Sequence, residues 1–378
     1  MPKLGDICTI QSGGTPSRSN PEYWEGGVIP WVKISDINGK FLNRTTEYIT
    51  KCGLDNSSAK IFPKGTILYT IFATLGEVCI LDIDAATNQA IAGLQITRKD
   101  VYPDYLYYHL VSKKKYVNEI GRGVAQNNIN MKILRDMEIV LPPLETQKHI
   151  AEELEKVSRL IDFRKQQLTK LDELVKARFV ELFGDPVNNS KGLPELTLPE
   201  LGELGRGVSK HRPRNDPKLL GGEYPLIQTG EVANSELYIT SYENTYSELG
   251  LKQSKMWKAG TLCITIAANI AKTAILTFDA CFPDSVVGFK ANNKTNNIFI
   301  HYWFSFFQAI LEAQAPESAQ KNINLKILSE LKIIVPPIEQ QNEFMAFVEQ
   351  TDKSKVAIQK SLDELETLKK ALMQKYFG

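Results

Sequence analysis

The stretch Asn128-Ile-Asn-Met-Lys-Ile-Leu returns 194 positions later as Asn322-Ile-Asn-Leu-Lys-Ile-Leu, and it opens the longest repeat in the chain. The repeat runs without a gap over residues 128–184 and 322–378, with 19 identities in 57 positions. Many of the mismatches conserve the size and polarity of the side chain. A repeat of this length indicates one supersecondary unit that the fold uses twice.

The residues in front of each copy repeat more faintly, at an offset of 195. Lys60-Ile-Phe-Pro-Lys-Gly-Thr-Ile aligns with Lys255-Met-Trp-Lys-Ala-Gly-Thr-Leu, and Gly93 aligns with Gly288. The chain therefore consists of two half-molecules. In each, the front part differs more between the two halves, and the back part is more similar. We expect four parts in chain order: a front domain at 1–144, a long helix at 145–184, a second front domain at 185–338 and a second long helix at 339–378.

Each back part has the pattern of a long amphipathic helix. Residues 144–183 contain neither Gly nor Pro, and their apolar residues recur at the alternating spacing of four and three that is typical of a coiled-coil seam. Pro142-Pro143 before this segment and Gly184-Asp185-Pro186 after it are start and stop signals. The expected seam residues are Ile150, Leu154, Val157, Ile161, Leu168, Leu171 and Val175 in the first helix and Phe344, Val348, Ile358, Leu362, Leu365 and Leu372 in the second.

A helix with an exposed apolar stripe is not stable alone in water, so each long helix needs a partner. The simplest partner is the other copy, because a folded domain between the two helices allows them to pair antiparallel within one chain. Packing of each helix on its own front domain, or on another chain, is the alternative. Charged residues interrupt the stripes at Arg164, Arg178, Lys355 and Lys369.

The front domains have the pattern of a mixed α/β fold. Short β-rich runs at 66–71 and 261–266 stand among Gly, Pro, Asn and Ser turns, and helical patterns come later in each domain. An apolar run before each long helix, at 137–141 and 331–335, is suited to a last strand. The fold class is therefore α+β: two globular mixed α/β domains joined by two long helices that pair as an antiparallel coiled coil, with a pseudo-twofold internal repeat.

The composition excludes several classes of protein. The 378 residues are 43% apolar, which suits two domains with real cores. The sequence contains no stretch of 18 apolar residues, which a membrane-spanning helix would need. Five cysteines without CxxC spacing indicate reduced thiols of a cytoplasmic protein, and four scattered histidines predict no metal site. The net charge of +1 argues against binding to nucleic acid by bulk electrostatics alone.

Sequence motifs for catalysis are missing. The chain has no GxxxxGK[ST] loop, no HExxH, no GxSxG and no strand-to-helix GxGxxG. We therefore expect a protein that is not an enzyme and that binds no cofactor of its own.

Polar loops in matching places of the two halves are the candidate binding residues. The loop from Gln11 to Asn20 carries hydroxyls and one arginine, and its counterpart near residues 209–215 is basic. Hydroxyls and backbone N–H groups suit phosphate, and arginine forks suit guanine edges, although a solvated loop is the alternative. For Gln126, Gln320 and Lys321, capping and packing of the domain–helix junction is the alternative. The candidate DNA contacts are Ser12, Thr15, Arg18, Lys33, Thr74, Arg122 and Gln126 in the first half and Lys210, Arg212, Arg214, Gln228, Asn269, Gln320 and Lys321 in the second.

Taken together, these features resemble the specificity subunit of type I restriction–modification systems, over essentially the whole chain. The resemblance lies in two variable domains that alternate with two repeated helices and in the Pro-Pro-Leu/Ile-Glu-x-Gln start at Pro142 and Pro336. It also lies in the Phe-Gly ends and in the openings Leu4-Gly5-Asp6-Ile7 and Leu201-Gly202-Glu203-Leu204.

The resemblance implies a non-catalytic, sequence-specific DNA-binding subunit. Each front domain would read one half of a bipartite, asymmetric sequence in double-stranded DNA, and the helices would set the spacer between the halves. Two modification subunits would dock on the helices, bind S-adenosylmethionine and methylate adenine N6. A restriction subunit, which uses ATP and Mg, can join them. The alternative function is a non-DNA two-domain scaffold or adaptor, which the near-neutral charge favours.

Overall fold

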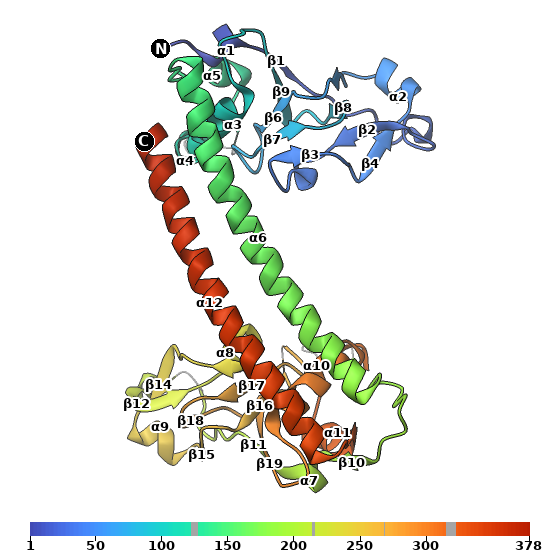
Figure 1. The fold of residues 1–378 in the computed structure, drawn as a ribbon, viewed down its shortest axis with the longest axis vertical. Helices are drawn as coiled ribbons and strands as arrows, with labels where there is room; N and C mark the ends of the chain where they lie inside the picture. Colours follow the sequence, from blue (N-terminus) through green and yellow to red (C-terminus); the bar gives the residue numbers. More distant parts are fainter. Residues whose placement is uncertain (122–127, 214–215, 268, 315–322) are drawn as a thin grey trace. The chain divides into compact units, whose positions relative to one another are not determined.

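The computed structural model describes residues 1–121, 128–213, 216–267, 269–314 and 323–378, and its elements are labelled in Figure 1. The chain divides into two compact units. Unit 1 consists of Met1–Lys165 with Lys360–Gly378, and unit 2 consists of Gln166–Gln359. Each unit is thus a mixed α/β domain together with one half of each long helix, and the α+β class expected from the sequence is confirmed. The division into four parts stays a prediction.

Unit 1 forms short strands between small helical turns, because its apolar runs are short and separated by turn residues. Its strands are β1 (Cys8–Ser12), β2 (Ile29–Val32), β3 (Phe41–Leu42), β4 (Glu47–Ile49), β5 (Ile61–Phe62), β6 (Ile67–Thr70), β7 (Val78–Leu81), β8 (Ala85–Thr87) and β9 (Ile91–Ile96). Its helices are α1 (Leu4–Ile7), η1 (Pro21–Tyr23), η2 (Ile34–Asp36), α2 (Lys51–Asp55), α3 (Pro103–Ser112), α4 (Lys114–Gly121) and α5 (Met131–Arg135), before the long helix α6 (Leu144–Phe183).

Unit 2 repeats this order of elements. Its strands are β10 (Glu195–Thr197), β11 (Gly202–Arg206), β12 (Leu220–Leu226), β13 (Tyr238–Ile239), β14 (Asn244–Tyr246), β15 (Met256–Trp257), β16 (Leu262–Thr265), β17 (Thr273–Leu276), β18 (Ala280–Cys281), β19 (Val286–Ala291) and β20 (Lys332–Ile334). Its helices are α7 (Leu198–Leu201), η3 (Pro217–Leu219), α8 (Thr229–Asn234), α9 (Glu248–Lys252), α10 (Asn297–Gln314) and α11 (Leu325–Glu330), before the long helix α12 (Ile338–Phe377).

The sheets of the two units have the same topology. Among the described residues, unit 1 has a five-stranded sheet in the order β1-β9-β6-β7-β3 and a four-stranded sheet in the order β4-β2-β8-β5. The corresponding orders in unit 2 are β11-β19-β16-β17-β13 and β14-β12-β18-β15. The faint repeat in the front parts therefore reflects a repeated sheet topology.

Two aligned glycines of the front parts allow an aromatic ring to lie directly on the sheet. A Cβ atom on Gly93 would lie 2.3 Å from the Phe62 ring, and one on Gly288 would lie 2.7 Å from the Trp257 ring. Both rings are buried. Because a larger residue at either glycine would displace the ring, the pair is preserved while its surroundings vary.

The apolar run before each long helix was expected to form a last strand. In unit 2 it does, since β20 pairs antiparallel with β10 at the start of the domain. In unit 1 the run makes only an isolated bridge between Lys3 and Glu138, next to a hydrogen bond from the Leu4 N–H to the Met137 carbonyl (2.8 Å). The prediction of a regular strand is therefore wrong for the first half, although the pairing partner lies in the same place.

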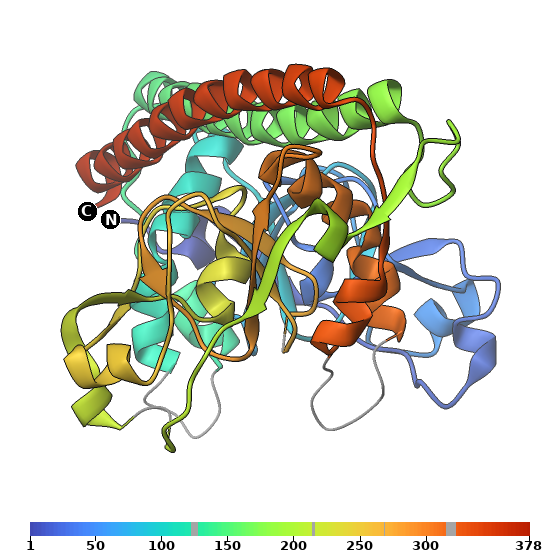
Figure 2. The same ribbon diagram turned by 90° about the horizontal axis from the view of Figure 1, so that it is seen from below.

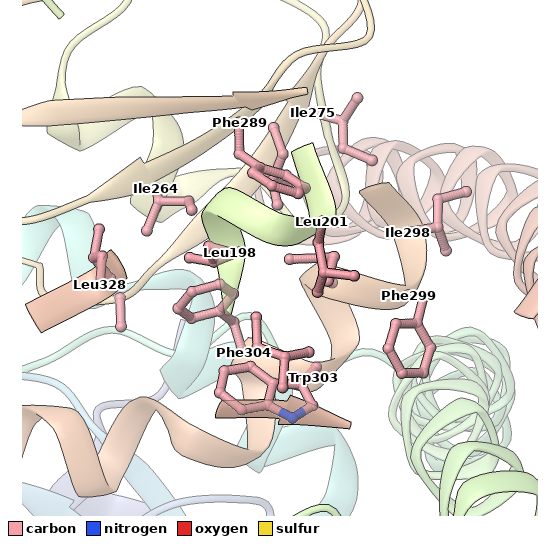
Figure 3. Packing of buried hydrophobic residues seen from close by; sticks show 14 of the residues in the cluster. Leu198, Leu201, Ile264, Ile275, Phe289, Ile298, Phe299, Trp303, Phe304 and Leu328 are labelled. Carbon is pink, nitrogen blue, oxygen red and sulfur yellow. The ribbon is translucent and has the colours of Figure 1, made fainter. Parts of the chain in front are cut away.

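The core of unit 2 joins the domain to its halves of the long helices. Figure 3 shows part of this core, where Leu198 and Leu201 of α7 and Phe299 and Trp303 of α10 are gathered. Phe179 and Phe183 of α6 belong to the same cluster. In unit 1, Tyr105 and Tyr108 of α3 pack in the same way against Ile150 and Leu154 of α6 and against Phe377 of α12. Packing on a domain, the alternative for the helices, thus occurs alongside helix pairing.

Within each unit, the halves of α6 and α12 run antiparallel. In unit 1, Glu153 accepts a hydrogen bond from the Tyr376 hydroxyl, and Lys165 pairs with Glu366 (3.1 Å). In unit 2, the order along the helices again reverses, because Arg178 pairs with Glu343 (2.6 Å) while Asp172 pairs with Lys355. Both views show the halves side by side (Figures 1 and 2).

The expected seam residues differ in burial. Ile150, Leu154, Val157, Ile161, Val175, Phe344, Val348 and Leu362 are buried, whereas Leu168, Leu171, Ile358, Leu365 and Leu372 are half-buried. The seam residues are therefore most deeply buried where a half-helix packs against the domain of its own unit.

Three of the charged residues that interrupt the apolar stripes have polar partners on the other helix. The Arg164 guanidinium donates to the Ser361 hydroxyl (3.2 Å), and Arg178 pairs with Glu343. The Lys355 side chain is 12% exposed and lies between Asp172 and Glu236 (3.3 Å). Lys369 is half-buried, and burial lowers the pKa of its ammonium. Because most of these residues have partners, they favour one register of the two helices.

The Pro-Pro-Leu/Ile-Glu-x-Gln motif fixes each long helix to its domain through the glutamine. The Gln147 amide donates to the carbonyls of Asp100 and Pro142 (both 2.8 Å), and its Oε1 accepts from the Tyr102 N–H (2.9 Å). The Gln341 amide donates to the carbonyls of Lys294 (3.0 Å) and Pro336 (2.8 Å), and its Oε1 accepts from the Thr295 hydroxyl (2.8 Å). Both glutamines are fully buried, so the motif is a clamp at the domain–helix junction.

Candidate nucleic-acid interface

One edge of unit 1 gathers most of the loops that carry the candidate DNA contacts. Strands β1, β2 and β6 end at this edge, beside the turn 88–90 that connects β8 to β9. Backbone hydrogen bonds join the loops to the turn: Gly13 N–H to Ile91 O (3.1 Å), Gly14 N–H to Thr87 O (2.9 Å) and Ile71 N–H to Ala90 O (2.8 Å). We call Ser12 and the loops 13–20, 33–40, 71–77 and 88–90 the loop edge of unit 1.

The first of these loops leaves β1 and turns across the sheet. Ser12 is the last residue of β1 and is half-buried. The Thr15 hydroxyl hydrogen-bonds to the Gln89 amide oxygen, which fixes the loop to the turn. Both candidates thus lie at the loop edge, and their polar groups are partly used within the protein.

Arg18 and Lys33 converge on one carboxylate. Arg18 Nη1 lies 2.6 Å from Oε2 of Glu47, and Lys33 Nζ lies 2.7 Å from its Oε1. Burial alone would raise the pKa of the Glu47 carboxyl, but the hydrogen bonds from Lys33 and Arg18 outweigh it and hold that pKa below its ordinary value. The carboxylate is therefore charged at neutral pH, and it sets the positions of both cations.

The Arg18 guanidinium also lies over aromatic rings. Its Cζ is 3.7 Å from the centre of the Trp24 ring and 4.9 Å from that of Trp31. Thr74 lies in the turn between β6 and β7 and is exposed, with its carbonyl accepting from the Thr70 hydroxyl. The loop edge of unit 1 thus carries Ser12, Thr15, Arg18, Lys33 and Thr74.

Unit 2 has the equivalent edge, built by β11, β12 and β16 beside the turn 282–285. The Gly207 N–H donates to the Val286 carbonyl (2.8 Å), and the Ile266 N–H donates to that of Ser285 (3.0 Å). Asn269 is exposed in the turn that corresponds to that of Thr74, and its carbonyl accepts from the Thr265 hydroxyl. The framework of the edge is therefore repeated, while its side chains differ.

The basic loop of unit 2 is held at two points. The N–H groups of Lys210 and His211 donate to Gln253 Oε1 (2.7 and 3.0 Å), and the Lys210 side chain is exposed. Arg212 Nη1 donates to the Ser209 carbonyl (2.6 Å), and its Nη2 lies 3.5 Å from Oδ2 of Asp284. Asp284 occupies the position of Gln89, so the same turn contacts the first loop in both units.

Gln228 is exposed and takes the position of Lys33, where both residues precede a short helical turn. The Lys33 N–H donates to Asp36 Oδ2 (2.8 Å), and the Gln228 N–H donates to Glu231 Oε2 (3.1 Å). These two carboxylates therefore cap helical turns, which explains why an acid stands at this position in both halves. Arg122, Gln126, Arg214, Gln320 and Lys321 lie outside the described residues.

The sequence did not point to Glu47, Trp24 or Gln89. Glu47 begins a three-residue strand, and its role depends on the pairing of β4 with β2, where Glu47 lies opposite Trp31. Pairing of this kind is non-local and leaves no periodic signal in so short a strand.

The profile of the type I restriction modification DNA specificity domain matches this chain twice, over residues 1–173 and 195–369. The chain therefore belongs to this family, as the resemblance indicated, and its class is that of a sequence-specific DNA-binding subunit.

Several relatives and solved structures match this chain along almost its whole length. The MjaIX specificity subunit of Methanocaldococcus jannaschii is 25% identical over 99% of this chain and 91% of the relative. The EcoprrI specificity subunit of Escherichia coli is 24% identical over 92% of this chain and 86% of the relative. The crystal structure of the S subunit from M. genitalium has the same fold, with a TM-score of 0.59, 15% identity and coverage of 100% of this chain and 95% of that one.

A second solved structure, which describes complex assembly of the type I restriction–modification system, gives a TM-score of 0.60 at 19% identity. It covers 99% of this chain and 96% of that one. Within the described ranges, no helix has the length and apolar composition needed to cross a bilayer.

Proposed function

We propose that the two α/β domains of this chain read the two halves of a bipartite DNA target. The observation that carries the proposal is the repeated loop edge: its strands and backbone hydrogen bonds recur in both units, whereas its side chains differ. Arg18 with Glu47 in unit 1 and Arg212 with Asp284 in unit 2 present different polar groups. Two domains with the same fold but different side chains at the loop edge are suited to a DNA sequence whose two halves differ.

We also propose that α6 and α12 set the spacer between the half-sites. Each is a continuous helix of 40 residues, which amounts to roughly 60 Å of helix. Half-sites on one face of DNA recur about every 34–36 Å, and helices of this length suffice for such a separation. The cross-helix pairs of Arg178 and Lys355 support a defined register.

The chain itself is proposed to be non-catalytic and cytoplasmic. Methyl transfer from S-adenosylmethionine to adenine N6 would belong to two modification subunits that bind the long helices, and ATP- and Mg-dependent cleavage would belong to a restriction subunit that can join. Exposed apolar side chains on the long helices, such as Phe163 of α6 at 58% exposure and Val356 of α12 at 65%, support protein contacts along these helices.

A domain exchange tests the proposed reading of half-sites. Residues 1–144 are replaced by the front domain of another specificity subunit, and the methylated sequence is mapped with the modification subunits present. The expected result is a change in one half of the target, with the other half and the spacer unchanged. Changes in both halves, or in neither, would contradict the proposal. A wild-type chain that retains no DNA at low salt would favour a protein scaffold instead.

A further inference from the structure

The most completely built polar position on the loop edge of unit 1 surrounds Arg18. The indole of Trp31 is buried, and its Nε1 donates to the Gly14 carbonyl (3.0 Å). The indole of Trp24 donates to the Ser17 carbonyl (3.0 Å) and meets Trp31 edge to face, with 5.0 Å between the ring centres. Both rings are thus hydrogen-bonded to the loop that carries Arg18, and they give its guanidinium a fixed surface to lie on.

Glu47 restrains the orientation of the Arg18 guanidinium further. It stands opposite Trp31 in the pairing of β2 with β4, and it holds Arg18 through Nη1 at 2.6 Å. Lys33 holds the other oxygen of the same carboxylate, so Glu47 is itself kept in place. The Arg18 side chain remains 53% exposed beside its ion pair with Glu47.

An arginine held in this way has the chemistry of a guanine reader. A guanidinium presents parallel donors in a planar fork, and guanine O6 and N7 accept such a pair in the major groove. Stacking on Trp24 and pairing with Glu47 reduce the side-chain entropy that binding would otherwise cost. A flexible, exposed lysine contacts phosphate equally well, but its ammonium has no planar fork to match guanine O6 and N7 together.

We propose that Arg18 reads a guanine in the half-site bound by unit 1, with Glu47 as the positioning residue that orients its guanidinium. This inference rests on the proposed function, because it assumes that the loop edge of unit 1 faces a half-site. Among the described residues of unit 2, the pair that corresponds to Trp31 and Glu47 is Leu226 and Asn244, which offers neither the indole nor the carboxylate. A guanine recognised in this way is therefore expected in one half-site only.

The test compares base preferences of full-length variants assembled with the modification subunits. R18K keeps the charge but removes the fork, R18A removes both, and E47Q keeps the shape of the side chain but removes its charge. Binding is measured on a DNA library in which each position of both half-sites is varied. R98A is the matched control, because Arg98 pairs with Asp100 (2.9 and 2.5 Å) just beyond the opposite end of β9.

We expect R18K and R18A to lose the preference for guanine at one position of one half-site by about 5- to 150-fold. E47Q is expected to lose part of the same preference at the same position, whereas R98A retains it. A purely structural role of Glu47 would lower binding to every sequence equally, and that outcome would overturn the proposal. Unchanged preferences in R18K would overturn it too. If the wild-type assembly distinguishes no bases at all, the proposed function fails with it.

Discussion

At the scale of single residues, the repeated motifs mainly serve the backbone. Asn130 and Asn324 cap α5 and α11, each accepting from the N–H three residues on (2.9 Å in both). Gln147 and Gln341 clamp the starts of the long helices. These residues recur because, apart from the Thr295 hydroxyl, their partners are main-chain groups, whose positions do not depend on the variable side chains around them.

The clamp leads to a prediction for Gln341. Replacing it by alanine leaves the buried Pro336 carbonyl without its donor, and an unsatisfied buried group costs about 1–3 kcal/mol. We therefore expect Q341A to lower the free energy of unfolding by that amount in denaturant titrations. Q340A is the control, since Gln340 is the exposed neighbour, and its effect should stay within about 0.5 kcal/mol. Equal effects of the two substitutions would contradict the clamp.

The residues of the site could be predicted only in part. Loops with Thr15, Arg18 and Lys33 were found from their polarity and their matching positions. Their partners were not, because Gln89 lies 74 positions from Thr15 and only strand pairing brings it close. The roles of Asp36 and Glu231 as caps also depend on short turns that leave little trace in sequence.

At the scale of elements, the long helices were the most predictable feature. The helix expected at 145–184 is observed as Leu144–Phe183, and the one expected at 339–378 as Ile338–Phe377. Periodicity and flanking proline and glycine are local signals, so they suffice for such helices. The strand orders could not be predicted, because β1 pairs with β9 and β3 with β7 across long stretches of chain.

The register of the helix pair gives a second prediction. Leu362 is 6% exposed, whereas Leu368 on the same helix is 46% exposed, although both fit the apolar stripe. Removing a buried leucine side chain costs about 2–5 kcal/mol, so L362A should destabilise the protein by about that much. L368A should change the free energy of unfolding by no more than about 0.5 kcal/mol. A larger effect for L368A in the same denaturant titration would place the seam elsewhere.

At the scale of the whole molecule, the two halves combine one design with two sets of loops. The same sheet topology and the same domain–helix junction recur, and duplication explains both. The side chains beside the loop edges differ between the halves, since Trp31 and Glu47 correspond to Leu226 and Asn244. The proposed recognition loops and the repeated framework thus occupy separate parts of each unit, so one can change without the other.

Shortening both long helices tests the proposed spacer. Deleting four residues from the middle of α6 and the matching four from α12 removes about 6 Å of helix, close to the rise of two base pairs. We expect the complex to methylate targets with a shorter spacer and unchanged half-sites. Replacing the same residues by alanine keeps the length and should keep the spacer. An unchanged spacer after the deletion would refute the proposal.

The sharing of helix halves has a consequence for synthesis on the ribosome. Unit 1 is completed by Lys360–Gly378, yet Gln166–Gln359 are translated before that segment appears. Until then, the face of Tyr105 and Leu154 that Leu372 and Phe377 cover stays open in the nascent chain. Unit 1 is thus begun before unit 2 but completed after it. A chain truncated before residue 360 would leave this apolar face of unit 1 exposed to water and prone to aggregation.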